Sequence, residues 1–437
     1  KVGVRNPSLD TLGYKEAFRL SNFNMYHNLS WKENIGTKWK FNGGLSYANN
    51  KDDIEGNIQD GTGRKADLGG FEYKNFQLDT RGIYINGKAV FERRFRGLSA
   101  LRFGGEYNGS NDRSDYETST GLQFPSRVKE NLLAGFAETD VYLTNELAAK
   151  FGGRLEHSQL LDKFNLSPRV SLAYKLGKES QASLAYGVFY QNPERRYLPT
   201  SADLGFTKAT HYIAQYQKVS ALQTLRAEVF YKKYDDLLKT VIVNNQEQAA
   251  SNAGYGYAQG FELFYRDKKS IKNVDFWISY SYLDTKRDFL NYPTEIQPGF
   301  AAKHTANFVV KKFVSSMKTQ FNANYVYASG RPYYNIRYDN ASNKFNIYDQ
   351  GKTIPYNSLS FSVNYLPHVF KPGSKKFTVL VLSVSNVLNS KQVFGYNYSY
   401  NGMRKDAIVP PSRTFVYIGA FFSFGVDRSQ DVINSNL

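Results

Sequence analysis

The sequence predicts an all-β protein, specifically a transmembrane, antiparallel, up-and-down β-barrel. Three observations carry this prediction. About seventeen segments alternate apolar and polar residues over roughly ten residues each, as expected of strands that cross a membrane with one face in lipid. The connectors between these segments alternate between short and long. Charged residues are nearly confined to one of the two faces of each segment.

The composition allows a barrel and excludes a helical membrane protein. The 437 residues include 34 Tyr and 32 Phe but no Cys, which excludes disulfides and thiolate metal sites. The most apolar run, Phe377 to Val384, is far shorter than the ~20 apolar residues that a membrane helix requires. The net charge of +17 comes from Lys and Arg spread along nearly every segment, so nucleic acid is not predicted as a partner.

The clearest strands lie near the C-terminus. Between Tyr356 and Leu366, four apolar residues alternate with Ser and Asn, so the two strand faces differ completely. The last strand runs from Arg413 to Phe424, and its aromatic tip is interpreted as the periplasmic end. A periplasmic turn is then predicted at Pro367 to Lys375, which contains two Pro and one Gly.

The remaining strands follow the same pattern toward the N-terminus. They are predicted near 377–394, 317–328, 274–282, 261–266, 225–232, 183–190, 169–176, 150–156, 130–143, 98–107, 80–93, 37–49 and 18–32. Short connectors are predicted near 33–36, 94–97, 144–146, 177–179, 219–221, 267–271 and 312–315. Long connectors are predicted near 51–78, 108–129, 191–205, 236–253, 285–300, 330–355 and 395–410. In membrane barrels, the short turns face the periplasm and the long loops face outside.

Charge sorting identifies the face that lines the lumen. The predicted lumen-facing charged residues are Arg154, Glu156, Arg169, Lys175, Arg226, Glu228, Glu262 and Arg266. The opposite face of the same strands carries almost no charge, and a lipid-facing Arg at the bilayer midplane costs ~2–4 kcal/mol. Tyr190, Tyr282 and Tyr365, near strand ends, suit the aromatic girdles at the membrane surfaces.

An odd strand count leaves the barrel incomplete. Because the first and last predicted strands both run inward, they cannot pair antiparallel, and bacterial barrels close with an even number of strands. Either the strand count is off by one, or residues 1–424 form a partial barrel that lacks roughly five strands upstream. In the second case, residues 1–17 are predicted to be the tail of an outside loop. Residues 425–437 are predicted to be a C-terminal extension. The N-terminus has no signal-peptide pattern, so either a leader was removed or the chain is a piece of a longer protein.

Several stretches, taken in order, resemble the C-terminal barrel of TonB-dependent outer-membrane receptors. They are 167–175 (SPRVSLAYK), 184–193 (LAYGVFYQNP), 208–212 (KATHY), 228–237 (EVFYKKYDDL), 259–263 (QGFEL), 329–332 (SGRP), 385–389 (SNVLN) and 422–424 (FSF). The resemblance implies a 22-stranded barrel in the outer membrane and an N-terminal plug that fills the lumen. It also implies import of a scarce nutrient, energised by a periplasmic TonB partner. This sequence contains neither the plug nor the segment that TonB would grip.

No enzymatic or metal-binding motif stands out, and no cofactor is predicted. The five histidines are scattered without metal-ligand spacing, and His157 beside Glu156 is interpreted as a residue without a catalytic task. An acidic segment holds Asp52, Asp53, Glu55 and Asp60, and is interpreted as a solvated outside loop rather than a calcium site. Two groups in outside loops are candidate ligand contacts: Arg195, Arg196 and Tyr197, and Arg331, Tyr333 and Tyr334. Arg suits carboxylate or phosphate, and Tyr suits sugars or stacked rings.

Three functions are therefore considered for the chain. The first is most of the barrel of a TonB-dependent receptor that imports a siderophore-like chelate, an oligosaccharide or a similar nutrient. The second is a passive porin with an open lumen, and the third is a barrel subunit of a larger outer-membrane assembly. The predicted partners are outer-membrane lipid, the TonB system through a plug domain, and a surface lipoprotein or other outer-membrane subunits.

Overall fold

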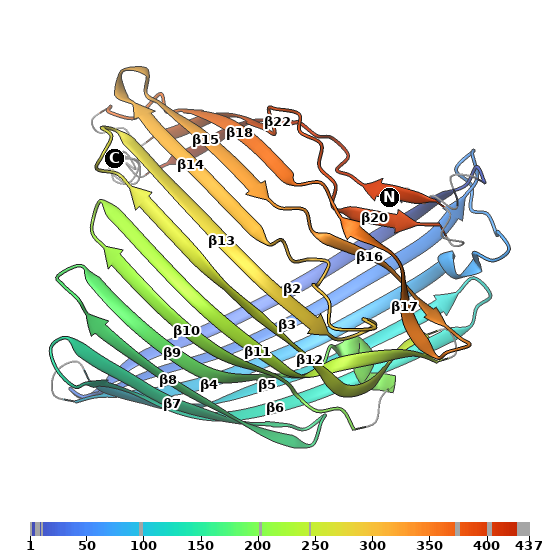
Figure 1. The fold of residues 1–437 in the computed structure, drawn as a ribbon, viewed down its shortest axis with the longest axis horizontal. Coiled ribbons are helices and arrows are strands. Elements are labelled where there is room, and N and C mark those ends of the chain that lie inside the picture. Colours follow the sequence, from blue (N-terminus) through green and yellow to red (C-terminus); the bar gives the residue numbers. More distant parts are fainter. Residues whose placement is uncertain are drawn as a thin grey trace.

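An open, curved β-sheet dominates the structure (Figure 1). The computed structural model describes residues 2–4, 9, 12–95, 99–200, 203–243, 246–371, 376–399 and 404–425. The main sheet has 18 strands, and two further sheets have two strands each. No helix in the described part of the chain is long and apolar enough to cross a membrane.

The elements of the main sheet follow the chain order. Its strands are β1 Val2–Val4, β2 Lys15–Ile35, β3 Trp39–Gln59, β4 Phe76–Arg94, β5 Ala100–Thr118, β6 Gln123–Tyr142, β7 Leu147–Ser158, β8 Lys163–Lys175, β9 Ser180–Gln191, β10 Thr207–Val219, β11 Gln223–Val243, β12 Gln246–Asp267, β13 Val274–Asp288, β14 His304–Val314, β15 Thr319–Ala328, β18 Tyr356–Tyr365, β19 Lys376–Ser385 and β22 Phe415–Phe424. The other elements are the hairpins β16 Pro332–Asp339 with β17 Lys344–Lys352 and β20 Gly395–Tyr398 with β21 Lys405–Ile408, and the short 3-10 helices η1 Glu72–Lys74, η2 Arg195–Thr200 and η3 Ser315–Met317.

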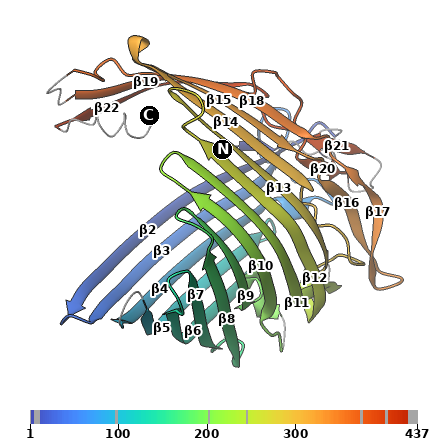
Figure 2. The ribbon, with the colours of Figure 1, turned by 60° about the vertical axis from the view of Figure 1, so that its left-hand side comes forward.

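Strands that are neighbours in the chain pair antiparallel throughout the main sheet. The order is interrupted at two places, where β15 pairs with β18 and β19 pairs with β22. The intervening residues form the two separate hairpins, which project beyond the sheet at one end of the molecule (Figure 2). We refer to this end as the outer end, because the long connectors also lie there.

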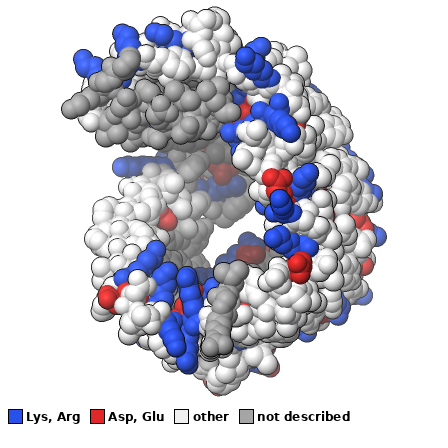
Figure 3. All heavy atoms as spheres, turned by 90° about the vertical axis from the view of Figure 1, so that its left-hand side faces the viewer, with Lys and Arg blue, Asp and Glu red and all other residues white. Residues whose placement is uncertain are grey.

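The sheet curves around a hollow without closing (Figure 3). Among the described residues, β22 pairs only with β19, and β1 pairs only with the first part of β2. The strand β1 corrects the prediction that residues 1–17 form the tail of a loop. The predicted first and last strands, β2 and β22, run in the same direction, as predicted, and β1 adds one strand antiparallel to β2. Without β1, seventeen strands remain in the sheet, as predicted.

Strand length differs between two regions of the sheet. Strands β2 to β6, here called the long wall, have 19 to 21 residues each. Strands β13, β14, β15, β18, β19 and β22, here called the short wall, have 10 to 15. A membrane strand needs only about 9–11 residues, so the long wall extends well beyond the thickness of a bilayer.

These extensions correct several predicted loops. Much of 51–78, 108–129 and 236–253 belongs to paired strands rather than to outside connectors. The segments 330–355 and 395–410 contain the two outer hairpins. Beyond the bilayer both faces of a strand contact water, so the apolar–polar alternation ends there although the hydrogen-bond ladder continues. Residues 426–437, most of the predicted extension, lie outside the described residues.

The sheet has no single hydrophobic core in its described part. One small buried cluster contains Tyr197, Leu204 and Leu238, and another contains Phe313, Leu366 and Val369. Most large apolar side chains are instead exposed along one face of the sheet, such as Leu29, Val229 and Ile418. Moving one such side chain out of water is worth roughly 1.5–3 kcal/mol, which an apolar solvent on that face would supply.

Candidate ligand-binding site at the outer mouth

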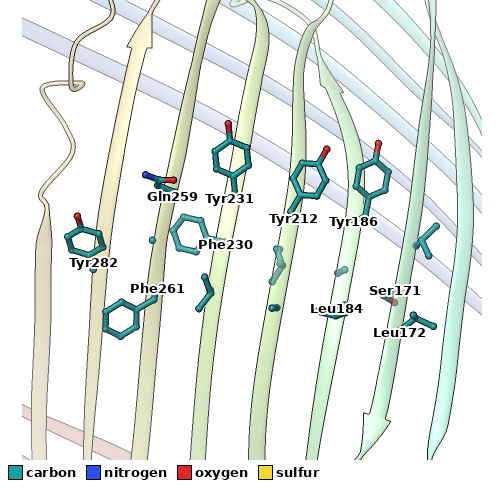
Figure 4. A pocket seen from close by; sticks show the side chains of 16 residues that line it. Ser171, Leu172, Leu184, Tyr186, Tyr212, Phe230, Tyr231, Gln259, Phe261 and Tyr282 are labelled. Atoms are coloured by element: carbon teal, nitrogen blue, oxygen red, sulfur yellow. The ribbon is translucent and has the colours of Figure 1, made fainter.

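The outward face of the sheet carries an apolar belt with a tyrosine edge. Tyr186, Tyr212 and Tyr231 lie opposite one another on β9, β10 and β11, and their ring centroids are 5.3 Å and 6.2 Å apart. Figure 4 shows their hydroxyls pointing in the same direction, with Leu184 and Phe261 below. These residues line a shallow groove of about 750 Å³. Because its lining is apolar and on the convex face, we assign the groove to lipid rather than to a polar ligand.

The opposite face of the long wall is a connected network of ion pairs. Arg102 on β5 contacts Asp140 at 2.6 Å and Glu92 at 2.9 Å. Nearby, Arg154 donates to Glu156 at 2.6 Å and lies 3.1 Å from Glu106. Charges that pair with one another across strands belong to one shared face, which is the face predicted to line the lumen.

The other predicted lumen residues lie on the same face. Arg226, Glu228 and Glu262 line a hollow of about 430 Å³ together with Ser279 and Ser281. Arg266 makes a two-point ion pair with Asp275, with contacts of 2.9 Å and 2.6 Å. Arg169 stacks over Phe189 at 4.8 Å. Lys175 is exposed at the end of β8, beside the short turn to β9.

The first candidate group lies on a connector that folds against the sheet. Arg195, at the start of η2, forms an ion pair with Asp112 on β5 and stacks over the Tyr84 ring at 5.2 Å. Arg196 pairs with Glu194 at 2.9 Å and stacks over the Tyr197 ring at 4.6 Å. The β9–β10 connector is thereby tied to the long wall.

Tyr197 itself is a packing residue in this connector. It is only 2% exposed, and its hydroxyl lies 3.4 Å from Glu247. Burial, with a further contribution from Glu247, raises the pKa of Tyr197 to about 12. The neutral, buried phenol of Tyr197 packs within the loop and is not accessible to a ligand. Of the three residues in this group, Arg196 has the most exposed side chain.

The second candidate group lies on β16 and just before it. The Arg331 guanidinium donates to the backbone oxygen of Phe394 at 2.9 Å. Within the described part of the chain no carboxylate is close enough to form an ion pair with Arg331, so most of its five N–H donors remain available. Tyr334 donates its hydroxyl to the Gln297 backbone oxygen at 2.9 Å. The structure therefore places the two candidate groups in separate loops, each tied to its own surroundings.

Five residues join the two outer hairpins, and we call them the hairpin clamp. They are Tyr333 on β16, Asp349 on β17, Tyr396 and Tyr398 on β20, and Lys405 on β21. The Lys405 ammonium lies 4.0 Å from the Tyr333 ring centre and 4.6 Å from the Tyr396 ring centre. It also lies 2.8 Å from Asp349, which accepts the Tyr398 hydroxyl at 2.6 Å. Aromatic faces attract a cation, and a desolvated contact of this kind is worth up to about 2 kcal/mol.

The hydrogen bonds within the hairpin clamp fix the protonation states of Asp349, Lys405 and Tyr398. Hydrogen bonds from Lys405 and Tyr398 lower the pKa of Asp349. Burial opposes the charge on Lys405, yet its hydrogen bonds to Asp349 and Tyr333 raise its pKa above the ordinary value. Burial, followed by the bond to Asp349, raises the pKa of Tyr398 to about 12. All three groups thus hold one protonation state near neutral pH.

Arg287, near the end of β13, is a candidate that the sequence reasoning missed. Its guanidinium lies 4.3 Å from the Tyr234 ring centre, 5.5 Å from Phe300 and 5.7 Å from Phe289. Its buried Nε atom has no hydrogen-bond partner in the described structure. The three rings come from three segments, so only the KRDF sequence around Arg287, a cation beside an aromatic residue, could have pointed to it.

The acidic segment lies partly within a strand of the sheet. Asp52, Asp53 and Glu55 lie within β3, which corrects their placement in a loop. Asp60 closes a turn by accepting bonds from the Thr62 hydroxyl and from the backbone N–H groups of Thr62 and Arg64 at 2.7–3.0 Å. In the described residues no three Asp, Glu or His side chains converge in a way that could hold a metal ion.

Comparison with solved structures gives the same architecture at low sequence identity. The ferric yersiniabactin uptake receptor FyuA from Yersinia pestis matches with a TM-score of 0.66 and 14% identity, covering 94% of this chain and 62% of that one. The outer membrane transporter YddB from Escherichia coli matches at 0.65 and 12%, covering 94% and 66%. The FrpB iron transporter from Neisseria meningitidis matches at 0.66 and 14%, covering 94% and 63%. The chain thus spans less than two thirds of the length of each.

No curated protein matches the sequence closely enough to report. A family described as TonB dependent receptor-like, beta-barrel, matches residues 3–387, which is most of the chain. This match confirms the predicted fold and the predicted outer-membrane location. The chain therefore belongs to the TonB-dependent receptor β-barrel family of the bacterial outer membrane.

Proposed function

We propose that this chain forms most of the barrel wall of an active outer-membrane importer, and that its ligand is an anionic or sugar-rich nutrient. The observation that carries the proposal is the pair Arg287 and Arg331 at the outer end. Each guanidinium lacks a carboxylate partner in the described structure, and aromatic rings surround Arg287. Such a cation, desolvated by rings and short of acceptors, attracts carboxylate, catecholate or phosphate oxygens.

The membership of the family supports import rather than catalysis. Among the structural relatives are the ferric citrate transporter FecA and a ferric-catecholate import receptor, Fiu, of Escherichia coli. Both names describe anionic iron chelates, which suits the two arginines. An oligosaccharide remains the second ligand class, because the outer end is also rich in tyrosine. TonB, acting through a plug domain, is the proposed energy-coupling partner, and a surface lipoprotein or another outer-membrane subunit stays a prediction.

Uptake by cells that carry the full-length protein tests this function. We expect accumulation of radioactive iron supplied as a citrate or a catecholate chelate, and loss of accumulation when TonB is deleted. The variants R287Q and R331Q should each weaken binding roughly tenfold, because each removes a charge-assisted hydrogen bond. K344Q, at an exposed hairpin position, is the matched control. Uptake that persists without TonB, with swelling of liposomes that hold the protein, would instead support a passive porin.

A further inference from the structure

The hollow of about 430 Å³ in the lumen face lies where β11 and β12 meet the first two strands of the short wall. Two rows of side chains cross it, and the strand register sets both rows. Directly opposite one another on β11, β12, β13 and β14, the outer row holds Glu228, Glu262, Ser281 and Thr305. Two residues nearer the periplasm on the same strands, the inner row holds Arg226, Phe264, Ser279 and Asn307. We call these eight residues the lumen hollow, and its volume is in the range of about 300–1,000 Å³ that small-molecule sites occupy.

The lumen hollow lies on the route from the outer mouth into the barrel. Its side chains point to the opposite face from Tyr231 and Tyr282, which line the convex groove. Ser281 directly precedes Tyr282, so the lumen hollow lies just inside the outer surface of the membrane. Arg287 is on the same strand and face as Ser281, six residues further out, which is about 20 Å along the strand. A ligand that leaves Arg287 for the lumen therefore meets the lumen hollow next.

The polar groups of the lumen hollow are not satisfied by one another. Glu228 and Glu262 lie directly opposite, an arrangement of like charges that destabilises a sheet unless a partner compensates it. In the described part of the chain neither carboxylate has an ion pair, and Glu228 accepts only a long bond of 3.4 Å from Gln215. The Arg226 guanidinium has no ion pair with a described residue either. The Oδ1 atom of Asn307 is buried and has no hydrogen-bond partner in the described structure.

We infer that the lumen hollow binds one neutral sugar unit of the ligand. A sugar hydroxyl both donates and accepts hydrogen bonds, and the lumen hollow offers both kinds of partner: two carboxylates accept, Arg226 donates, and the Ser and Thr hydroxyls do either. The Phe264 ring supplies an apolar face for the C–H groups of the sugar ring. An anionic group would meet two carboxylates, and a metal cation would meet the Arg226 guanidinium.

This inference selects the sugar-bearing class among the ligands of the proposed importer. The passage of the sugar through the lumen rests on the proposed function, whereas its binding in the lumen hollow does not.

Calorimetric titration of the full-length protein in mild detergent tests the inference, with maltotriose, cellotriose and mannotriose as the probes. We expect saturable binding of at least one trisaccharide. Binding to E228Q/E262Q should be roughly 10- to 100-fold weaker, because hydroxyl bonds to two charged acceptors are lost. F264A should weaken binding roughly 2- to 10-fold, through loss of the ring face. The matched control is E55Q/E117Q, which removes two carboxylates from the outward face of the long wall, one on each side of Gln77.

A further arm separates this inference from the proposed function. R287Q/R331Q should bind the trisaccharide as the unaltered protein does, even where uptake of the iron chelates is lost. Heat-resistant migration on gels confirms that each variant is folded. The inference is overturned if none of the three trisaccharides binds saturably, whatever the result of the chelate uptake, or if E228Q/E262Q and the matched control bind equally. It is also overturned if E228Q/E262Q exposes the plug domain to trypsin while sugar binding is unchanged, since the carboxylates would then serve to hold the plug.

Discussion

The long wall and the short wall reach the outer surface in different ways. In the long wall the membrane strands themselves continue outward, and their lumen face is a network of ion pairs that centres on Arg102 and continues from Glu106 to Arg154 on the neighbouring strand β7. In the short wall the strands end at the membrane surface, and separate hairpins extend from them. The lumen face there is lined with Ser and Asn, such as Asn322, which donates to Ser362 at 2.9 Å.

The difference teaches how one sheet serves two purposes. A continuous ladder gives the long wall a rigid rim, on which charged rows can be held in fixed register. The short wall carries loops whose position depends on a few side-chain contacts, chiefly the hairpin clamp. Regions of few contacts open at low free energy, and ligand-binding segments are drawn from such regions. We therefore expect ligand-linked motion in the hairpins and not in the rim.

The largest expected effect comes from placing a charge within the apolar belt of the long wall. L45R should destabilise the folded barrel by ~2–4 kcal/mol, because an Arg would replace a lipid-facing Leu. N49R, four residues further out on the same face, should cost at most about 1 kcal/mol. Urea unfolding from lipid vesicles measures both. Equal costs for the two variants would show that the belt does not end between these positions.

A second test compares the two lumen faces. R102M should destabilise the protein by about 1–3 kcal/mol, because it leaves Glu92 and Asp140 close together without their shared partner. In the short wall, N322A should cost about 0.5–1 kcal/mol, because only one neutral hydrogen bond is lost. Urea unfolding from lipid vesicles measures the stability cost of both variants. A larger cost for N322A would contradict the view that ion pairing stabilises the long wall specifically.

A third, local effect concerns the hairpin clamp. K405M removes the cation from its tyrosine faces and from Asp349, so the two hairpins should separate without unfolding the barrel. Hydrogen exchange in β20 and β21 should become roughly tenfold faster, while exchange in β3 to β5 should not change. K344M, on the same pair of hairpins but outside the clamp, is the control. Unchanged exchange in K405M would mean that other contacts hold the hairpins.

The smallest expected effect is the response of the clamp to pH. The pKa of Asp349 is lowered from 3.8 in the folded protein, so the contribution of this group is fully present above 3.8 and is lost as pH falls through the lowered value. The Tyr398 phenol stays neutral up to about pH 12. Protection of β20 and β21 should therefore be constant from pH 5 to pH 8, roughly the range of maximal stability for most proteins. A change within that range would point to a different titrating group.

Sequence patterns predicted the membrane part of the fold well and the outer part poorly. The strand from Tyr356 was predicted to within one residue, because lipid on one face and water on the other impose strict alternation. The extension of β3 to Gln59 was missed, because its acidic residues were interpreted as a solvated loop. Of the candidate site, Arg331 and Tyr333 were proposed from residue type and loop position, and their role stays a prediction. Arg287 was missed, since two of its three rings, Tyr234 and Phe300, come from other segments of the chain.

The sequence by itself determined the fold class and the face of each strand that contacts lipid, because both depend on a period of two residues within one segment. Register between strands and contacts between loops depend on residues far apart in the chain. Only the tertiary structure therefore decided that Glu228 aligns with Glu262, and that Lys405 lies among tyrosines of two hairpins. Those alignments, rather than the alternation, carry what is specific to this protein.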